Sequence, residues 1–328
     1  MINKTAKIME CSRIFSLPMT ILSWLVIFTF SLIDSGNILY GILALIGICF
    51  AHLGTNLLDD YFDYKSLIKQ VDFNKSEYLK QSQKTKCRYI IAGFMREKDV
   101  LILASVYFII ALICGLFLYI KCGAGVIKFA FAGAFIALIY PFISRICLSE
   151  IAVGLAFGPI LFGGVYYVMT GIFSNDVLIL SIPTMFMTIV LLYIHTVMDY
   201  EFDLNEAKKT IANLFNSQLE SLIVLKILLI LAYLSLILLC IFDILDWQIF
   251  FVGLTIPIAI DLYKSMVIFA SNPNELPPKK WYHFPMENMK NLKKNNEDSF
   301  MVRIYQARNL MIYFSLILTI SIILSKAI

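Results

Sequence analysis

Nine long apolar runs, separated by polar segments, set the hydrophobic pattern of this chain. A run of about 20 apolar residues is long enough to cross the hydrocarbon core of a membrane as a helix. The pattern predicts nine such helices, over residues 15–33, 38–58, 100–120, 123–143, 151–172, 177–198, 219–242, 247–269 and 310–324. The expected fold is an all-α polytopic membrane protein, with residues 1–328 forming a single integral membrane domain.

The composition agrees with this pattern. Of the 328 residues, 60% are hydrophobic and the mean hydropathy is +0.81, whereas ordinary soluble domains are about 45–50% apolar. The first apolar run is long enough to span, and no small-residue cleavage site follows it, so we expect no cleaved signal peptide. The seven cysteines include no CxxC pair, which argues against a zinc site and a disulfide framework.

Lysine and arginine are concentrated in alternate loops. The loops at about 59–99, 199–218 and 270–308 are basic, as is the segment before the first run. The positive-inside rule therefore predicts a cytoplasmic N-terminus, an odd number of spans, and these three loops in the cytoplasm. The formal net charge of +4 follows from the same bias, so no nucleic acid is expected as a partner.

A first group of acids ends the second apolar run. Asn56 is followed by Asp59, Asp60 and Asp63 at offsets of three, four and seven residues, so a helix turns all four side chains to nearly one face. Three carboxylates this close repel one another unless a cation lies among them. Hard oxygen ligands favour Mg²⁺ over Zn²⁺.

A second group of acids ends the sixth run. Asp199 and Asp203 are one helical turn apart, and Lys208 and Thr210 follow them. Because Mg²⁺ is held by a few carboxylates together with substrate phosphates, two such clusters suggest a diphosphate bridged to the protein through metal. The alternative is that acids at the ends of membrane helices are merely solvated.

Other polar residues are secondary candidates. Asp72 offers a further acid for metal, and Arg88 offers a guanidinium suited to phosphate oxygens. Lys208 is suited to a diphosphate as a point charge. Arg13 is interpreted as a topology anchor.

Three further features favour structural roles. His52 and His195 each lie one turn deeper than the acids, where hydrogen bonding is favoured over metal ligation, and plain packing is favoured over both. Asp261 and Lys264, three residues apart, predict an ion pair within one helix. Pro277-Pro278-Lys-Lys-Trp-Tyr is interpreted as an interfacial loop that rests its aromatic rings at the lipid headgroups.

With both acid groups identified, the chain resembles the UbiA superfamily of intramembrane prenyltransferases. Asp59-Asp60-Tyr-Phe-Asp63 is similar to the first family motif, N-D-x-x-D, although Asp59 replaces the usual Asn. Asp199 to Asp203 with Lys208-Lys-Thr210 is similar to the second motif. Leu67 stands where a third acid is expected, and Asp72 matches that acid if a few residues are inserted.

Within the superfamily, the 1,4-dihydroxy-2-naphthoate polyprenyltransferase branch of menaquinone biosynthesis is the most similar. The stretches that suggest it are Asp60-Tyr-Phe-Asp63-Tyr-Lys, Val71-Asp72, Arg88 with Ala92-Gly93, Phe157-Gly158 with Tyr166-Tyr167, and Asp199-Tyr-Glu201-Phe-Asp203.

The resemblance implies a fold and a reaction. About nine helices would bundle around a central cavity in a bacterial or archaeal cell membrane, with both acid motifs cytoplasmic. A prenyl group would pass from a prenyl diphosphate to a small aromatic, quinol-type or lipid-like acceptor, with Mg²⁺ as cofactor and with no protein partner implied.

The resemblance also implies roles for individual residues. Asp60, Asp63, Asp199 and Asp203 would be catalytic and, with Asp59 and Asp72, would hold the metal. Asn56, Arg88 and Lys208 would bind the diphosphate.

Two other classes of function fit parts of the pattern. Carboxylates within a membrane also mark ion pathways, so a transporter or cation channel is the alternative. That reading predicts acids near the midplane on broken helices, whereas these acids lie at helix ends beside basic loops. Asp59-Asp60-x-x-Asp63 also matches the DDxxD motif of soluble polyprenyl synthases, against which the nine spans argue.

Overall fold

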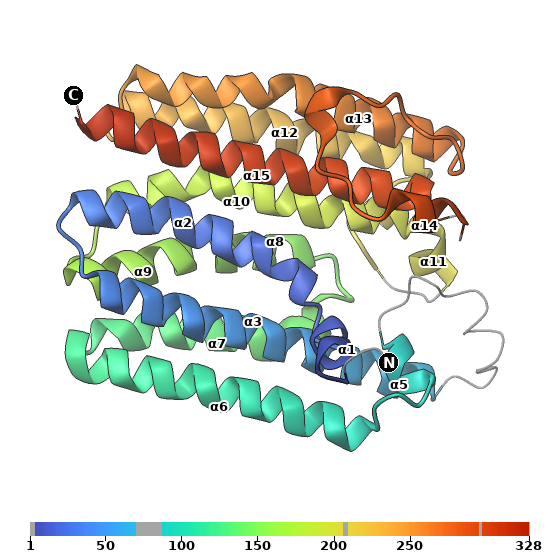
Figure 1. Ribbon diagram of the computed structural model, residues 1–328, viewed down its shortest axis with the longest axis horizontal. Coiled ribbons are helices and arrows are strands. Elements are labelled where there is room, and N and C mark those ends of the chain that lie inside the picture. Colours follow the sequence, from blue (N-terminus) through green and yellow to red (C-terminus); the bar gives the residue numbers. More distant parts are fainter. Residues whose placement is uncertain (1–3, 70–86, 206–208, 295–296, 328) are drawn as a thin grey trace. The chain divides into compact units, whose positions relative to one another are not determined.

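The computed structural model describes residues 4–69, 87–205, 209–294 and 297–327. Within these residues nine helices are long and apolar enough to cross a membrane, which confirms the all-α, membrane-spanning architecture (Figure 1). The chain divides into two compact units. The first comprises residues 1–21 and 39–142, and the second comprises residues 22–38 and 143–328.

The first unit is built around three long helices. Its elements are α1 (Lys4–Cys11), η1 (Ile14–Ser16), the start of α2 (Leu17–Ile33), α3 (Ile38–Leu67), α5 (Arg88–Ile91), α6 (Glu97–Cys122) and α7 (Gly125–Ile143). Helix α3 packs closely against α6, because a Cβ at Gly54 would lie 3.2 Å from the ring of Phe108 and one at Gly47 would lie 3.1 Å from Cys114.

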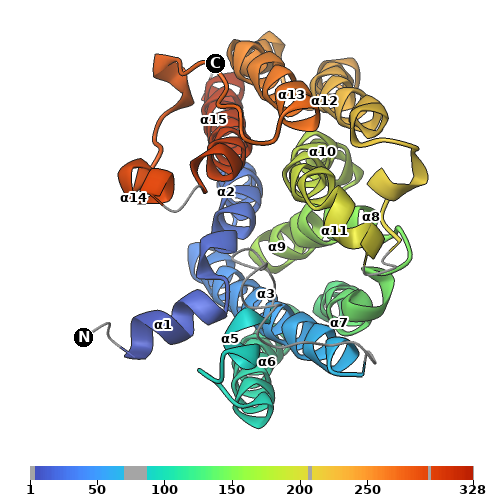
Figure 2. The ribbon, with the colours of Figure 1, turned by 90° about the vertical axis from the view of Figure 1, so that its right-hand side faces the viewer.

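A hydrophobic core cluster of the first unit lies at the end of α3 that carries the first acid motif. Leu57 and Leu67 of α3, Ile90 and Ile91 of α5, and Val100 of α6 are all buried in one hydrophobic cluster. The short helix α5 is thereby fixed against α3 and α6, as the end view in Figure 2 shows. The position of α5 matters because it carries Arg88.

The second unit is organised around α10. Its elements are α8 (Ser149–Leu155), the π-helical turn η2 (Ala156–Ile160), α9 (Leu161–Thr170), α10 (Asn175–Met198), α11 (Tyr200–Asn205), η3 (Ala212–Leu214), α12 (Gln218–Ile241), η4 (Trp247–Thr255), α13 (Ile256–Ser271), η5 (Trp281–His283), α14 (Met289–Lys294) and α15 (Asp298–Ala327). Helix α10 contacts α8, η2, α9, α12, α13 and α15, and residues such as Leu180 and Tyr193 are fully buried. Helix α10 is therefore the central helix of this unit.

The fifth predicted span is one helix interrupted by a kink. At η2 the backbone of Gly158 leaves helical geometry, with φ −97° and ψ −109°, just before Pro159. Proline lacks the backbone N–H that a continuous helix needs, so it breaks the hydrogen-bond ladder here. The kink brings the backbone close to α10, because a Cβ at Gly158 would lie 2.8 Å from Cβ of Met185.

The last span begins earlier than the sequence predicts. Helix α15 starts at Asp298, not near residue 310. The hydropathy pattern misses its first half because that half contains Arg303, Gln306 and Asn309. These polar residues lowered the apparent hydropathy, yet all three are almost fully buried. Arg303 is accommodated because it donates to the carbonyl oxygens of Ser265, Ser299 and Glu275.

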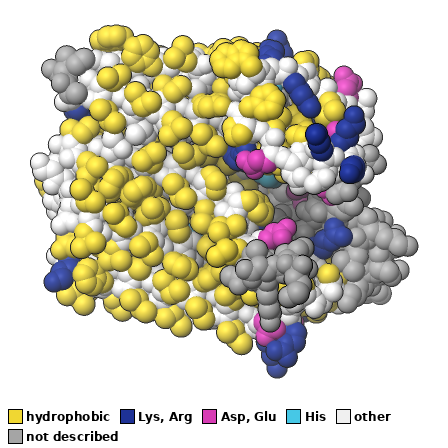
Figure 3. All heavy atoms as spheres, in the orientation of Figure 1, with side chains coloured by type: hydrophobic (Ala, Val, Ile, Leu, Met, Phe, Trp, Pro, Cys, Tyr) yellow, Lys and Arg dark blue, Asp and Glu magenta, His cyan; other side chains and the backbone are white. Residues whose placement is uncertain are grey.

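The helix sides are strongly apolar on their exposed faces. Helix α6 exposes Ile102, Ile109 and Ile113, and α7 exposes Phe131 and Phe142. In Figure 3 hydrophobic side chains cover most of the visible face, and charged side chains gather toward the right-hand end of the view. Exposed apolar surface of this extent is expected where helices contact lipid tails.

Candidate active site

The first acid motif lies at the end of α3, where two of its carboxylates are buried. Asp59 and Asp60 are each 1% exposed, and Asp63 is partly exposed. Arg13 donates to Asp60 Oδ1, and its Nη2 lies 3.6 Å from Asp59 Oδ2. The alternative of merely solvated acids therefore does not hold for Asp59 and Asp60.

Arg13 reaches these acids because the chain turns sharply before α2. Arg13 has a left-handed backbone with φ 56° between α1 and η1, and its side chain is 20% exposed. Burial alone would lower the pKa of Arg13, but the carboxylates of Asp60, Asp59 and Asp63 raise it. Arg13 is therefore a permanently charged counter-ion of the motif.

Two residues in the preceding turns of α3 also form hydrogen bonds to the N-terminal segment, residues 12–20. Asn56 Nδ2 donates to Ser16 Oγ at 3.1 Å and to the carbonyl oxygen of Ser12 at 3.5 Å. One turn deeper, His52 hydrogen-bonds Thr20 at 2.7 Å and Ser16 at 3.2 Å. His52, Asn56 and Asp60, four residues apart, thus form a ladder of polar contacts to residues 12–20 (the polar ladder).

Two candidates have structural contacts in this ladder. Asn56 is predicted to bind the diphosphate. Its amide nitrogen donates to the N-terminal segment, and its role toward the diphosphate stays a prediction. His52 has the hydrogen-bonding role that was one of its two expected roles.

Helix α5 places an aromatic group beside the first motif and carries Arg88. Arg88 is the first residue of α5 and is partly exposed. The hydroxyl of the next residue, Tyr89, is buried, and burial followed by the nearby Asp60 carboxylate raises the pKa of Tyr89. Tyr89 is thus a neutral phenol beside the carboxylates.

The second acid motif spans the junction of α10 and α11. Asp199 ends α10 in a non-helical conformation, and the backbone N of Asp203 still donates to the carbonyl oxygen of Asp199 at 2.8 Å. The one-turn spacing is therefore kept. Asp203 is 5% exposed, whereas Asp199 is partly exposed and Glu201 is exposed.

The segment after the second motif is tied to the segment before α8. Residues Ile146 and Lys209 form a bridge of parallel type, in which the backbone N of Cys147 donates to the carbonyl oxygen of Lys209 at 3.0 Å. Thr210 is 3% exposed. This bridge fixes the backbone immediately after the Lys208 position.

A buried acid that the sequence did not single out lies near the second motif. Glu150 is fully buried in the first turn of α8. It accepts from Ser149 Oγ at 2.7 Å and from Thr196 Oγ1 at 3.0 Å. Thr196 lies three residues before Asp199, so Glu150 holds the end of α10 that carries the second motif.

The described acids do not form a complete metal cage on their own. In the part of the chain that the structure describes, no group of three or more His, Cys, Asp or Glu side chains is placed to hold a metal ion. Asp72 and Lys208 lie outside the described residues. Their predicted roles, and the meeting of the two motifs in one site, stay predictions.

Comparison with known proteins identifies the family. The model of the UbiA prenyltransferase family matches residues 17–289. A solved structure described as digeranylgeranylglyceryl phosphate synthase is 15% identical, with a TM-score of 0.60 over 98% of this chain and 99% of that one. No curated protein sequence matches significantly.

Two other solved structures share the fold. A UbiA homologue from Archaeoglobus fulgidus bound to GPP and Mg²⁺ is 13% identical, with a TM-score of 0.57 over 92% of this chain and 98% of that one. The apo structure of a UbiA homologue from Aeropyrum pernix K1 is 15% identical, with a TM-score of 0.55 over 91% and 96% of the two chains. The match to the family model covers most of the chain, and the chain therefore belongs to the UbiA prenyltransferase family.

Proposed function

We propose that this chain transfers a prenyl group from a prenyl diphosphate to a small acceptor in the membrane, with Mg²⁺ as cofactor. The observation that carries the proposal is that each acid motif ends a membrane-spanning helix with a carboxylate almost fully buried, Asp60 in α3 and Asp203 after α10. Ionisable groups at membrane depth are costly to bury and mark functional sites. Carboxylates that end two membrane helices are suited to Mg²⁺ held together with a substrate diphosphate.

The residues fit Mg²⁺ by their chemistry. Mg²⁺ is usually bound by one or two carboxylates together with substrate phosphates rather than by a complete protein cage, and each motif offers carboxylates of this kind. Asp60, Asp63, Asp199 and Asp203 would hold the ion, with Asp59 and Asp72 in support. When bound, Mg²⁺ neutralises charge on the diphosphate as it leaves.

The chain's own residues would do the remaining work. Arg88 and Lys208 would bind phosphate oxygens and stabilise the negative charge of the leaving group. The bond between C1 of the prenyl group and the diphosphate oxygen breaks, and its electron pair leaves with the diphosphate. An electron-rich acceptor then forms a bond to C1 and loses a proton. A site with little water protects the allylic cation from hydrolysis.

For the acceptor we propose an aromatic or quinol-type ring, with 1,4-dihydroxy-2-naphthoate as the first candidate. This finer proposal is supported by the stretches that resemble the naphthoate branch, among them Asp199-Tyr-Glu201-Phe-Asp203 and Phe157-Gly158. On this proposal the chain contributes to menaquinone biosynthesis, with its N-terminus and both motifs at the cytoplasmic face.

The test is product formation by the detergent-purified protein. It is assayed with geranyl, geranylgeranyl and longer prenyl diphosphates, with Mg²⁺ or with EDTA, and with 1,4-dihydroxy-2-naphthoate or a prenylated glyceryl phosphate as acceptor. We expect Mg²⁺-dependent release of diphosphate and a prenylated naphthoate. Asp60→Asn and Asp203→Asn should each lower the rate about 100-fold or more, since each removes charge stabilisation at the reacting group.

A matched control lies on the same helix as the second motif. Asp176 is an exposed acid in the first turn of α10, at the end opposite Asp199, and Asp176→Asn should leave the rate unchanged. A product with only the glyceryl phosphate would keep prenyl transfer and discard the naphthoate. No release from any donor, together with ion flux through reconstituted liposomes, would overturn the enzyme in favour of a transporter.

A further inference from the structure

The segment between α13 and α15 is firmly attached to both helices. We call residues 272–294 the strap; in Figure 1 it is the orange to red segment that leads from α13 through α14. Arg303 of α15, which is fully buried, donates to the carbonyl oxygens of Ser265 in α13 and Glu275 in the strap, at 3.1 and 2.8 Å. Asn309 donates to the carbonyl oxygens of His283 and Pro285. The strap is therefore a fixed part of the second unit.

The strap also supplies three hydrogen bonds to one acid of α13. Asp261 accepts from Lys280 Nζ at 2.7 Å, from the Tyr282 hydroxyl at 2.7 Å and from His283 Nε2 at 3.0 Å. The ion pair of Asp261 is thus with Lys280, and the ion pair with Lys264 that the spacing predicts is wrong. Lys280 of the strap takes the place of Lys264 as the partner, because three donors of the strap converge on the Asp261 carboxylate.

A cavity of about 220 Å³ lies between the strap and the two helices. Its lining includes Asp261, Lys264 and Ser265 of α13, Gln306 of α15, and Lys280 and His283 of the strap. A water molecule takes up roughly 30 Å³ of liquid, so the cavity is large enough for a small molecule. It belongs entirely to the second unit.

Two residues that line this cavity each carry a buried polar atom with no hydrogen-bond partner among the described residues. These atoms are Ser265 Oγ and Gln306 Oε1, whose residues are 0% and 1% exposed. The amide nitrogen of Gln306 lies 3.4 Å from His283 Nδ1, so its oxygen is left to accept from another donor. Buried polar groups normally have partners, and a hydroxyl in the cavity would supply one to each of these atoms.

The charge at the cavity is positive. Asp261 and Lys280 balance each other as an ion pair. Lys264 is exposed and forms no ion pair among the described residues. The net charge contributed by these three side chains is therefore positive, and it favours an anionic ligand.

The cavity also lies near one end of the candidate span Trp247–Ser271. The 3₁₀ helix η4 rises about 2 Å per residue and α13 rises about 1.5 Å, so Lys264 lies about 30 Å along the span from Trp247, which is the thickness of the hydrocarbon core. On the strap, Trp281 is 85% exposed and Phe284 is 49% exposed. Exposed aromatic residues at this level are typical anchors at lipid headgroups.

We propose that this cavity binds the headgroup of an anionic phospholipid that carries free hydroxyls, as a glycerol headgroup does. The lipid phosphate pairs with Lys264, and the headgroup hydroxyls bond Ser265 Oγ and Gln306 Oε1. The lipid chains continue along the apolar surface of the span, beside Trp281. The proposal does not depend on the proposed transferase function.

The test measures lipid binding to the purified full-length protein by native mass spectrometry and by the melting temperature. Phosphatidylglycerol, phosphatidylserine and phosphatidylcholine are compared with glycerophosphoglycerol, which has the same headgroup without chains. We expect phosphatidylglycerol to bind most tightly and to raise the melting temperature most. Lys264→Gln should weaken phosphatidylglycerol binding about fivefold, the effect of one lysine near an anionic lipid. Gln306→Leu should reduce the protein's preference for phosphatidylglycerol over phosphatidylserine.

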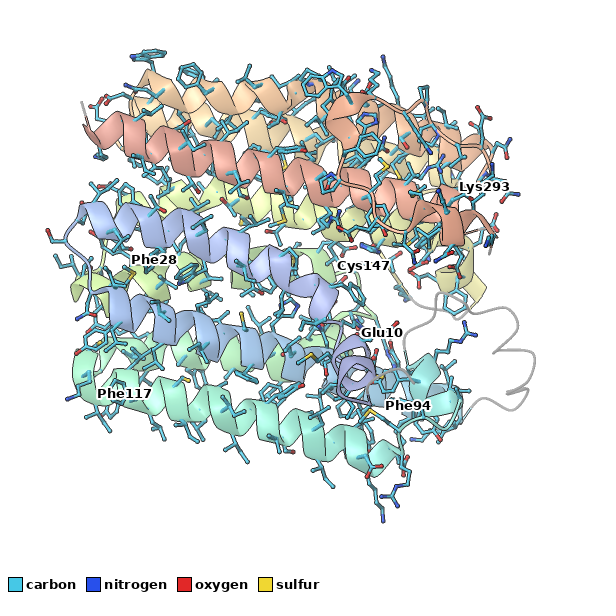
Figure 4. All side chains as sticks on the ribbon, viewed as in Figure 1. Glu10, Phe28, Phe94, Phe117, Cys147 and Lys293 are labelled. Carbon is cyan, nitrogen blue, oxygen red and sulfur yellow. The ribbon has the colours of Figure 1, made fainter. Side chains whose placement is uncertain are left out.

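The matched control is Lys293→Gln. Lys293 is an exposed lysine of α14 that does not line the cavity (Figure 4), and its substitution should leave lipid binding unchanged. Equal losses in Lys264→Gln and Lys293→Gln would show only surface attraction and overturn the site. Equal binding of all three lipids would do the same. Tight binding of glycerophosphoglycerol without chains would replace the lipid with a soluble phosphate ester.

Discussion

At the scale of single residues, the first acid motif is governed by one guanidinium. Asp59 and Asp60 are almost fully buried, and Arg13 contacts both. Because buried like charges repel strongly where water is excluded, the motif needs this counter-charge when no other cation is bound. Arg13 is therefore a structural member of the motif, although it lies 47 residues before Asp60 in the chain.

Arg13→Gln should destabilise the protein. It leaves two buried carboxylates without their counter-ion, which costs roughly 3 kcal/mol for a pair of this kind. We expect a clearly lower melting temperature in detergent without Mg²⁺, and partial recovery when Asp60→Asn removes one of the two charges. Arg96→Gln is the control, because Arg96 pairs with Asp99 at an exposed position. Equal melting temperatures for Arg13→Gln and Arg96→Gln would contradict this role.

The sequence predicts the acids of this site but not their counter-ion. Spacing alone brings Asp59, Asp60 and Asp63 to one face of a helix. From the sequence, Arg13 is interpreted as a topology anchor, which is the usual role of an arginine just before a span. The left-handed backbone at Arg13, which turns it toward α3, has no signal in the sequence. The sequence feature that points to a counter-ion is the excess of acids over nearby basic groups in the first motif.

At the scale of elements, the kinked span α8–η2–α9 is shaped by glycines that face α10. A Cβ at Gly154 would lie 2.6 Å from Ile189, and one at Gly158 would lie 2.8 Å from Met185. Small residues of this kind allow helices in membranes to approach closely. The kink just before Pro159 lies in the same stretch of the span.

Gly158→Ala should lower stability by about 1–3 kcal/mol, because the added methyl group forces Met185 or the backbone to move. Gly115→Ala in α6 is the matched control, since a Cβ there meets nothing within 4 Å, and alanine is the better helix former. Thermal unfolding in detergent measures both variants. The packing argument fails if Gly158→Ala melts at or above the temperature of Gly115→Ala.

The ends of elements were less predictable than their existence. Hydropathy placed the start of the last span near residue 310, but α15 begins at Asp298. The difference arises because Arg303 finds three carbonyl oxygens and the ring of Phe269, 4.9 Å away. Partners of this kind come from segments far apart in the chain, so a window of neighbouring residues does not reveal them.

At the scale of the whole molecule, the number of spans follows from physics that is local in sequence. Each apolar run must satisfy its backbone hydrogen bonds internally in lipid, and a helix does so without help from other segments. The nine predicted runs therefore correspond to the nine candidate spans of the described residues. How the two acid motifs meet depends on packing between distant segments, and it stays a prediction.

An odd number of spans predicts that the two ends of the chain lie on opposite sides of the membrane. The distribution of lysine and arginine places the N-terminus in the cytoplasm. A fluorescent protein fused to the N-terminus should fluoresce, and alkaline phosphatase fused to the C-terminus should be active outside. The reverse pair of fusions is the control. Both ends on one side would require eight or ten spans.

The polar ladder on α3 has a practical consequence for handling this protein. Residues 12–20 contact His52, Asn56 and Asp60 in turn. A deletion that trims the start of the chain through residue 13, as is common when expression clones are shortened, would therefore remove a charge from the first acid motif. A shortened clone of this kind loses the Arg13 charge together with the Ser12 carbonyl that accepts from Asn56, and its kinetics should be interpreted in that way.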